Sequence, residues 1–248
     1  MMVLAARDAV AQPKCPGDLN GDGRVTIDDI LRSVNYALDG CPMRFVDNGD
    51  GSISDNWTGL MWEKKIKLDG TADYANLHDA DNYYLWANRC SSNTSKLCQP
   101  SAAAAAACAA GVEGDATVCA RCTSSDGTCT YSGGETTIWE WLASLNAANF
   151  AGHADWRISK RGELEAIVDY ADTTSPVINV AFQGASCGAR CADITNPACA
   201  CTRSDNYWSA SAIAHDTTYA WFVDFNTGFV NWYFKDRDFY VRAVRGGL

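Results

Sequence analysis

An acidic loop near the N-terminus carries oxygen-bearing side chains at the spacing of a calcium site. Positions 1, 3, 5, 9 and 12 of this loop supply such side chains, and a glycine stands at position 6, where the chain must turn sharply. Alternate residues of a tight loop converge on one centre, which suits a hard cation such as Ca²⁺. In loop order, with position 7 included, the predicted metal-site residues are Asp18, Asn20, Asp22, Arg24, Thr26 and Asp29. We expect a structural Ca²⁺ here, and a polar turn without metal is the alternative.

The chain has twelve cysteines in 248 residues, and this even number favours oxidation outside the cytoplasm. Most of them fall into two clusters, which are Cys90, Cys98, Cys108, Cys119, Cys122 and Cys129, and then Cys187, Cys191, Cys199 and Cys201. We expect structural disulfides, whose pairing the sequence does not determine. Zinc binding is an alternative, as is a redox role for Cys119 and Cys122.

Aromatic side chains gather near the C-terminus in a number that one face of a sheet cannot absorb. They are Tyr207, Trp208, Tyr219, Trp221, Phe222, Phe225, Phe229, Trp232, Tyr233, Phe234, Phe239 and Tyr240. Side chains alternate between the two faces of a strand, so residues 229–234 would place bulky groups on both. We therefore expect aromatic groups on the outer side of the last strands, beside polar residues, as in a protein-binding surface. Burial of both faces beneath the chain's own insertions is the alternative.

Residues that commonly catalyse reactions are sparse and poorly placed. The three histidines, His78, His153 and His215, have no spacing that builds a metal site or a nucleophile arrangement. Glu163 and Glu165 are two residues apart, so on a helix their side chains point in different directions. We do not expect an enzyme, and a thiol-dependent oxidoreductase is the remaining catalytic alternative.

The overall charge limits the classes of partner. Twenty Lys and Arg against thirty Asp and Glu give a net charge of −10, which repels nucleic acid and acidic membrane surfaces. No segment approaches the roughly 20 apolar residues that span a bilayer. The sequence Ala9-Val10-Ala11 is typical of a cleavage site, so residues 1–14 are interpreted as a signal remnant or linker. We expect a secreted or cell-surface protein.

Short elements must position these groups. Residues 43–47, 52–55 and 60–64 are predicted strands, with Asn48-Gly49-Asp50-Gly51 as a hairpin turn. Two apolar stripes predict helices, one after Thr137 as the N-cap and one after Ser159. A third predicted helix follows Thr26 and ends at Gly40; its apolar face holds Ile27, Ile30, Leu31, Val34, Ala37 and Leu38.

Five motifs, in order, carry a resemblance to a known family. They are Arg44 to Gly51, Thr58-Gly59-Leu60-Met61-Trp62, Asp155-Trp156-Arg157 with Glu163-Leu164, Tyr207-Trp208-Ser209, and Tyr240 to Arg245. From about residue 43 to the end the chain resembles the Lcl C-terminal domain family. The resemblance implies an α+β, C-type-lectin-like fold, with two helices on a small twisted, mostly antiparallel sheet and the first and last strands adjacent. The sequence lacks Glu-Pro-Asn, Gln-Pro-Asp and Trp-Asn-Asp triplets, so calcium-dependent sugar chelation of the usual lectin kind is not expected.

Residues 15–41 resemble a single type I dockerin repeat, an EF-hand-like calcium module. This resemblance implies a disulfide between Cys15 and Cys41, which bracket the repeat. Dockerins pair two repeats to bind a cohesin, and only one is present, so cohesin docking is not expected. The expected organisation is thus a dockerin-like repeat at 15–41 and a lectin-like domain at 43–248, with cysteine-rich insertions at about 88–135 and 184–203.

The C-terminal aromatic segment is also similar to the variable region of proteins diversified by retroelements, in which edited asparagine codons yield a limited set of residues. Candidate variable positions are His215, Asp216, Thr217, Thr218, Tyr219, Phe222, Asp224, Asn226, Phe229, Asn231, Tyr233, Phe234, Asp236, Arg237, Asp238 and Phe239. All of them except Thr217 are also the predicted ligand contacts. Trp232 cannot arise from an asparagine codon by this editing. We expect a protein or cell-surface ligand, and a carbohydrate adhesin is the alternative.

Overall fold

The N-terminal strands form where the sequence alternates and then turns at glycine. The computed structural model describes residues 26–27, 30–31, 34, 43–89, 97–98, 106, 136–183, 193–196, 199–213, 216 and 218–247. The first strands are β1 (Phe45–Asp47), β2 (Ser52–Asp55) and β3 (Leu60–Glu63), which confirms the three predicted strands with ends shifted by at most two residues. The predicted turn between β1 and β2 is also confirmed, because Asn48 donates to the Ser52 carbonyl at 3.0 Å and Gly49 has a φ of 74°.

The last strand joins these strands into one antiparallel sheet. This strand, β12 (Ala243–Gly246), lies between β3 and β7 (Arg157–Ile158), which gives the order β1-β2-β3-β12-β7. The expectation that the first and last strands are adjacent is therefore wrong. The tight hairpin pairs β1 with β2 and leaves β1 at the sheet edge. The side of β3 away from β2 therefore pairs with β12, with Val244 opposite Trp62.

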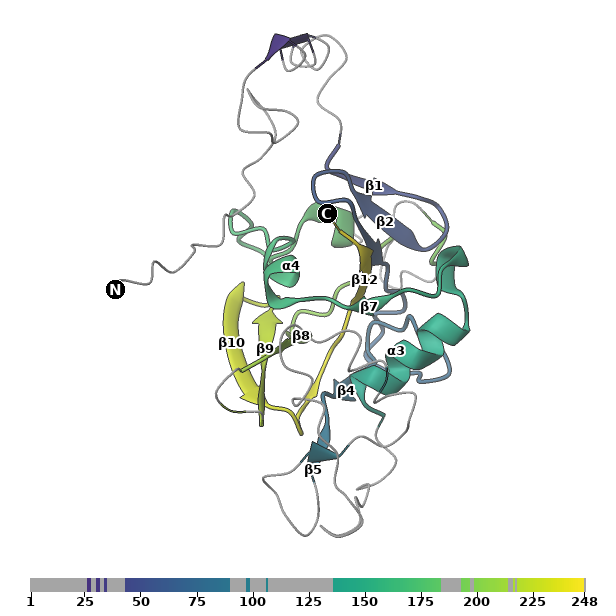
Figure 1. Ribbon diagram of the computed structural model, residues 1–248, viewed down its shortest axis with the longest axis vertical. Helices are drawn as coiled ribbons and strands as arrows, with labels where there is room; N and C mark the ends of the chain where they lie inside the picture. The colour runs from purple at the N-terminus through teal and green to yellow at the C-terminus, as the bar shows by residue number, and fades with distance from the viewer. Residues whose placement is uncertain are drawn as a thin grey trace, which may run out of the picture.

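A second antiparallel sheet carries the aromatic segment. Its strands are β8 (Asn206–Ala212), β9 (Tyr219–Asp224) and β10 (Phe229–Phe234), in the order β10-β9-β8. Two small pairs complete the strands: β4 (Tyr84–Leu85) with β11 (Asp238–Phe239), and β5 (Asn88–Arg89) with β6 (Leu97–Cys98). In Figure 1 the three-stranded sheet lies on one side of the body and the longest helix on the other.

The two predicted helices of the main domain are present, but they differ in how well the sequence located them. Helix α3 (Ile138–Ala147) begins behind Thr137, whose side chain accepts from the Glu140 N–H, as predicted. Helix α4 (Arg161–Glu165) is shorter, and Ser159 is not its cap. The buried Ser159 hydroxyl instead donates to the Arg242 carbonyl at 3.0 Å, and the Glu163 carboxylate accepts from the Lys160 N–H at 2.7 Å.

Short 3-10 helices lie at η3 (Phe150–Gly152) and η4 (Val180–Phe182). The fold is thus mixed, with few helices and antiparallel sheets, in agreement with the α+β class. No helix in the described ranges combines the length and apolar character that crossing a membrane requires.

Two apolar clusters pack on opposite faces of the three-stranded sheet. Trp208 and Phe222 are paired across β8 and β9 and belong to the cluster that contains Trp139 of α3. Tyr207 and Val223 are the neighbouring pair and belong to the cluster that contains Leu164 of α4. Because successive side chains alternate in direction, these two pairs face opposite ways, so β8 and β9 are held on both sides.

Most of the expected N-terminal repeat and of the first insertion lies outside the described residues. Ile27, Ile30, Leu31 and Val34 are helical and exposed, and the Ile30 N–H donates to the Thr26 carbonyl at 3.1 Å. The end of the second expected insertion, by contrast, is part of the body. Its Cys199 and Cys201 are buried and disulfide-bonded.

Replacing Thr137 by alanine should lower the free energy of unfolding by about 0.5–2 kcal/mol, because α3 would lose the side chain that caps Glu140 N–H. Urea denaturation of the oxidised chain measures this change. Thr137→Ser retains the hydroxyl and should cost less. Equal losses in the two variants would show that the cap is not the source of the effect.

Candidate functional site

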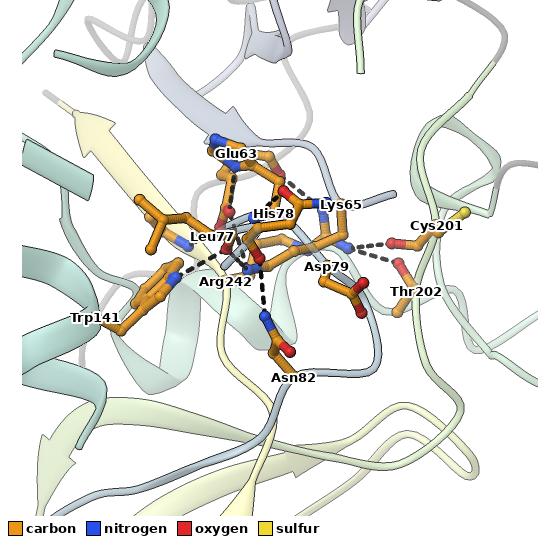
Figure 2. Close-up of polar contacts among 12 residues, drawn as sticks. Glu63, Lys65, Leu77, His78, Asp79, Asn82, Trp141, Cys201, Thr202 and Arg242 are labelled. Carbon is orange, nitrogen blue, oxygen red and sulfur yellow. Dashed lines mark hydrogen bonds and ion pairs between the residues drawn. The ribbon is translucent and has the colours of Figure 1, made fainter. Parts of the chain in front are cut away.

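A buried cluster of charges lies between β3 and β12 and is the first place to look for chemistry. Glu63 Oε1 is 2.9 Å from Lys65 Nζ and 2.9 Å from His78 Nδ1, and Glu63 Oε2 accepts from the Ala243 N–H at 3.0 Å. Arg242 donates through Nη1 to the Glu63 carbonyl at 2.7 Å. Figure 2 shows these side chains converging on one another inside the body.

The same cluster ties the disulfide-bonded segment to the sheet. Arg242 Nη2 donates to the Cys201 carbonyl at 2.8 Å and to Thr202 Oγ1 at 2.7 Å (Figure 2), and the Cys201 N–H donates to the Lys65 carbonyl at 2.8 Å. Glu63, Lys65 and Arg242 are all buried, so a substrate could not reach them in this conformation. The cluster therefore positions the strands and is not a binding site.

Charge pairing sets the protonation of this cluster. Burial alone would raise the pKa of Glu63, but the Lys65 ammonium and the His78 ring, with the Ala243 N–H, outweigh burial and lower that pKa below its ordinary value of 4.5. Burial lowers the pKa of Lys65, and the Glu63 carboxylate opposes part of that change. The ion pair thus stabilises the fold while Glu63 is ionised.

The aromatic residues of β9 and β10 form a second, accessible candidate. Cross-strand register places Trp232 opposite Trp221 and Phe234 opposite Tyr219, so these four side chains share one face. The ring centroids are 5.3 Å apart in the Trp221–Trp232 pair and 4.5 Å apart in the Tyr219–Phe234 pair. We call these four residues the aromatic platform.

One exposed cation extends the platform. The Arg161 guanidinium, at the start of α4, lies over the Trp221 ring, with Cζ 4.6 Å from the ring centroid. Trp232 is 49 % exposed, and the other three platform side chains are partly exposed. A ligand would therefore meet a large aromatic surface and a cation held over it, which suits contacts with apolar, aromatic and anionic groups.

The reverse face of β10 is also accessible. Phe229 is 59 % and Tyr233 43 % exposed, and both lie on the face opposite the platform. Tyr233 is within 6.0 Å of the Phe239 ring, centroid to centroid, and 5.8 Å from the Arg237 guanidinium. Unlike β8 and β9, β10 thus presents aromatic groups to solvent on both faces.

The turn between β9 and β10 fixes the geometry of both faces. Asp224 accepts from the Asn226 N–H at 2.7 Å and from the Thr227 hydroxyl at 2.6 Å, while the Gly228 N–H donates to the Asp224 carbonyl at 2.7 Å. Gly228 has a φ of 76°, and a Cβ there would come within 3.0 Å of Tyr170 Cε1. The turn therefore requires glycine at this position.

The predicted ligand contacts divide into several groups. Tyr219 and Phe234 are on the platform, while Phe229, Asn231 and Tyr233 are on the reverse face. Asp224 is the last residue of β9, and those outside the strands are Asp216 and Thr218 before β9, Asn226 after it, and Asp236 and Arg237 after β10. Asp238 and Phe239 form β11. His215 and Thr217 lie outside the described residues.

Phe222 is the exception among the predicted contacts. It is only 8 % exposed and lies between Trp208 and Phe239, with centroid distances of 6.5 and 5.1 Å. Its side chain points to the face covered by the core, so it supports the sheet from inside and does not meet a ligand.

The predicted ligand contacts left out Trp221, Trp232 and Arg161, although both tryptophans were counted in the aromatic segment. The pairing of the two tryptophans could have been predicted, because only four residues separate β9 from β10. Such a short turn determines which residues of the two strands lie opposite each other. Arg161 comes from a distant helix, and no local pattern links it to Trp221.

Of the six predicted metal-site residues, Thr26 is described, and Asp18, Asn20, Asp22, Arg24 and Asp29 lie outside the described residues. Within the described ranges, no group of three or more His, Cys, Asp or Glu side chains is arranged to hold a metal ion.

Replacing Glu63 by glutamine should lower the free energy of unfolding at pH 7 by about 3–5 kcal/mol, because Lys65 would remain buried without its counter-charge. Glu63 has a lowered pKa in the folded state, so its contribution is present above pH 4.5 and is lost as the pH falls through the folded-state value. Denaturant titrations at several pH values measure both effects.

The matched control is Asp155→Asn, which removes the exposed pair with Arg245 and should cost less than about 1 kcal/mol. Similar losses in the two variants, or an acid dependence unchanged by Glu63→Gln, would contradict the structural role of the buried pair.

Comparison with known proteins bears on the main domain. The model of the Lcl C-terminal domain family matches residues 51–245. No curated protein and no solved structure matches the chain. The family match confirms the resemblance carried by the five motifs and spans most of the chain, from the β1–β2 turn to the last strand. The chain therefore belongs to the Lcl C-terminal domain family.

Proposed function

We propose that this chain is a secreted or cell-surface ligand-binding protein whose aromatic platform and β10 recognise a protein ligand. The observation that carries the proposal is that Trp232 is half-exposed and packs on Trp221, and that the Trp221 ring lies beneath the Arg161 guanidinium. Tryptophan, tyrosine and arginine are the residues that contribute most to protein–protein affinity. The surface combines tryptophan and tyrosine side chains on the paired strands β9 and β10 with an arginine from the start of α4.

A protein ligand fits this geometry better than a sugar. The Trp221 and Trp232 rings meet at 74°, so they do not form one flat surface on which a sugar ring could stack. Phe229 and Tyr233 add exposed aromatic area on the reverse face of the same strand. A ligand that wraps around β10 could use both faces, and a protein chain is large enough to do so.

The fold and the N-terminal repeat extend this proposal. We assign a C-type-lectin-like fold, supported by the family resemblance, the antiparallel sheets and the two helices α3 and α4. We further assign a structural Ca²⁺ to the dockerin-like repeat, on the spacing of its acidic loop. Secretion is supported by the twelve cysteines, of which Cys199 and Cys201 are disulfide-bonded.

Retroelement diversification of the C-terminal segment is a further extension of the proposal. Several candidate variable positions, including Phe229, Asn231 and Tyr233, lie on the exposed strand β10, where changes would alter a ligand surface and spare the core. Sequencing the surrounding locus tests this idea. Absence of both a near-repeat template and a nearby reverse transcriptase gene would end it.

Replacing Trp232 by alanine should weaken ligand binding by at least about 2 kcal/mol, or roughly thirtyfold, because the central aromatic contact would be lost. The full oxidised chain is first screened on protein and glycan arrays. Its affinity for the best ligand is then measured by surface plasmon resonance.

Trp57→Ala is the matched control, because Trp57 is an exposed tryptophan that also lies beside an arginine, Arg44, but in the turn between β2 and β3. It should leave the affinity unchanged. Equal effects of the two variants would contradict the proposal, and selective binding to glycans would replace the protein ligand by the carbohydrate alternative.

Removing calcium should destabilise the N-terminal repeat and leave the aromatic surface intact, because the loop and the surface share no residues. Calorimetric titration of the full oxidised chain with Ca²⁺, using an Asp18→Asn, Asp22→Asn variant as the control, measures the site. Absence of heat specific to the unaltered chain would reject the calcium assignment.

A further inference from the structure

Strand β10 ends its sheet. In the order β10-β9-β8, only β9 pairs with it, and no other strand in the described part of the chain lies along its outer edge. Figure 1 shows β10 as the outermost element on that side of the body. Within the described ranges, the backbone of Val230 and Trp232 on this outer edge is therefore not paired with another strand.

The direction of the backbone groups identifies which residues face outward. Just beyond β10, the Lys235 N–H donates to the Thr218 carbonyl at 3.0 Å and so continues the pairing toward β9. The direction of the backbone N–H and C=O groups alternates along an antiparallel strand. The backbone groups of Asn231 and Tyr233 therefore point toward β9, and those of Val230 and Trp232 point away from it. The Trp232 N–H accordingly donates to the Asn231 side-chain Oδ1 at 2.9 Å.

This edge has little of the usual protection against strand addition. Native edge strands are commonly protected by charged side chains, prolines or bulges. The six residues of β10 include no charged residue and no proline, and their register with β9 contains no shift. The Asn231 carboxamide oxygen accepts from the outward Trp232 N–H, and rotation of the Asn231 side chain would free that N–H.

We propose that an extended segment of the protein ligand adds to the outer edge of β10 as a fourth strand, pairing with the backbone of Val230 and Trp232. The inference rests on the proposed function and specifies how the ligand is held. Alternate side chains of the added strand would lie on the same face as the aromatic platform, where apolar groups would contact Trp232.

Charge selects the occupant of this edge. The chain carries a net charge of −10, so a second copy would bring an equal negative charge to the interface. An added strand with aliphatic side chains on the platform face, beside Arg161, and with lysine or arginine on the opposite face would instead offset it. We therefore assign the edge to a basic, extended segment of another protein.

A short acetylated peptide of alternating valine and lysine is the probe, and the isotope-labelled full chain is the target. The expected result is slower hydrogen exchange at the Val230 and Trp232 amides, by at least about tenfold, when the peptide is bound. The same peptide N-methylated at alternate residues lacks half of its donors and should bind at least about tenfold more weakly.

Two variants of opposite expected effect complete the test. Val230→Pro removes an outward N–H and should weaken peptide binding, whereas Asn231→Ala uncovers the Trp232 N–H and should strengthen it by about threefold. Near-ultraviolet circular dichroism checks that each variant is folded. A gain of affinity in Asn231→Ala cannot arise from misfolding, so the test does not depend on Val230→Pro alone.

The outcomes separate this inference from the proposed function. Equal binding of the plain and N-methylated peptides, or no protection of the two amides, overturns strand addition. Protection that grows with protein concentration in the absence of peptide also overturns it, in favour of self-association. An array ligand that requires Trp232 but binds Asn231→Ala and Val230→Pro as it binds the unaltered chain would leave the proposed function standing and reject the added strand.

Discussion

Packing on both faces of strands β8 and β9 is the constraint on which the rest of the structure depends. Trp208 and Phe222 face the cluster beneath α3, while Tyr207 and Val223 face the cluster beside α4. A strand held on both sides cannot twist or slide without breaking one cluster. Strand β10 is joined to this fixed core by a tight turn but has its own aromatic groups in solvent. A rigid base therefore supports an accessible edge.

The buried charges make the base continuous with the first sheet. Glu63 and Lys65 lie at and just beyond the end of β3, and Arg242 precedes β12. Through Cys201 and Thr202, Arg242 also holds the segment that leads into β8. Burial of three charged side chains is costly unless each is paired and hydrogen-bonded, so this arrangement is geometrically demanding. It fixes the two sheets relative to each other at the point where the aromatic segment begins.

Local signals predicted the elements well and the long-range pairings poorly. Alternation and glycine placed β1, β2 and β3, and the capping residue Thr137 placed the start of α3. The residue type of Ser159 predicted a helix cap, but Ser159 is buried and its hydroxyl donates to the carbonyl of the distant Arg242. The Glu63 cluster went unpredicted because its members are separated by up to about 180 positions and meet only through sheet pairing.

The aromatic surface shows the same division. Its location was predictable from the density of aromatic residues, and the exposure of Phe229, Trp232 and Tyr233 agrees with that expectation. The assignment of individual residues to faces depends on which strand pairs with which. Phe222 was expected outside and is inside, while Trp221 was left out of the predicted contacts and forms part of the platform. Periodicity identifies two faces, but only packing decides which of them is covered.

Hydroxyl-radical footprinting of the full oxidised chain, free and with its ligand, tests the central claim most directly. If β10 is an open recognition surface, Phe229, Trp232 and Tyr233 will be oxidised readily in the free chain and shielded by the ligand, while Phe222 will stay unreactive throughout. Slow oxidation of the three β10 residues in the free chain would show that the chain covers its own aromatic surface and would contradict the account.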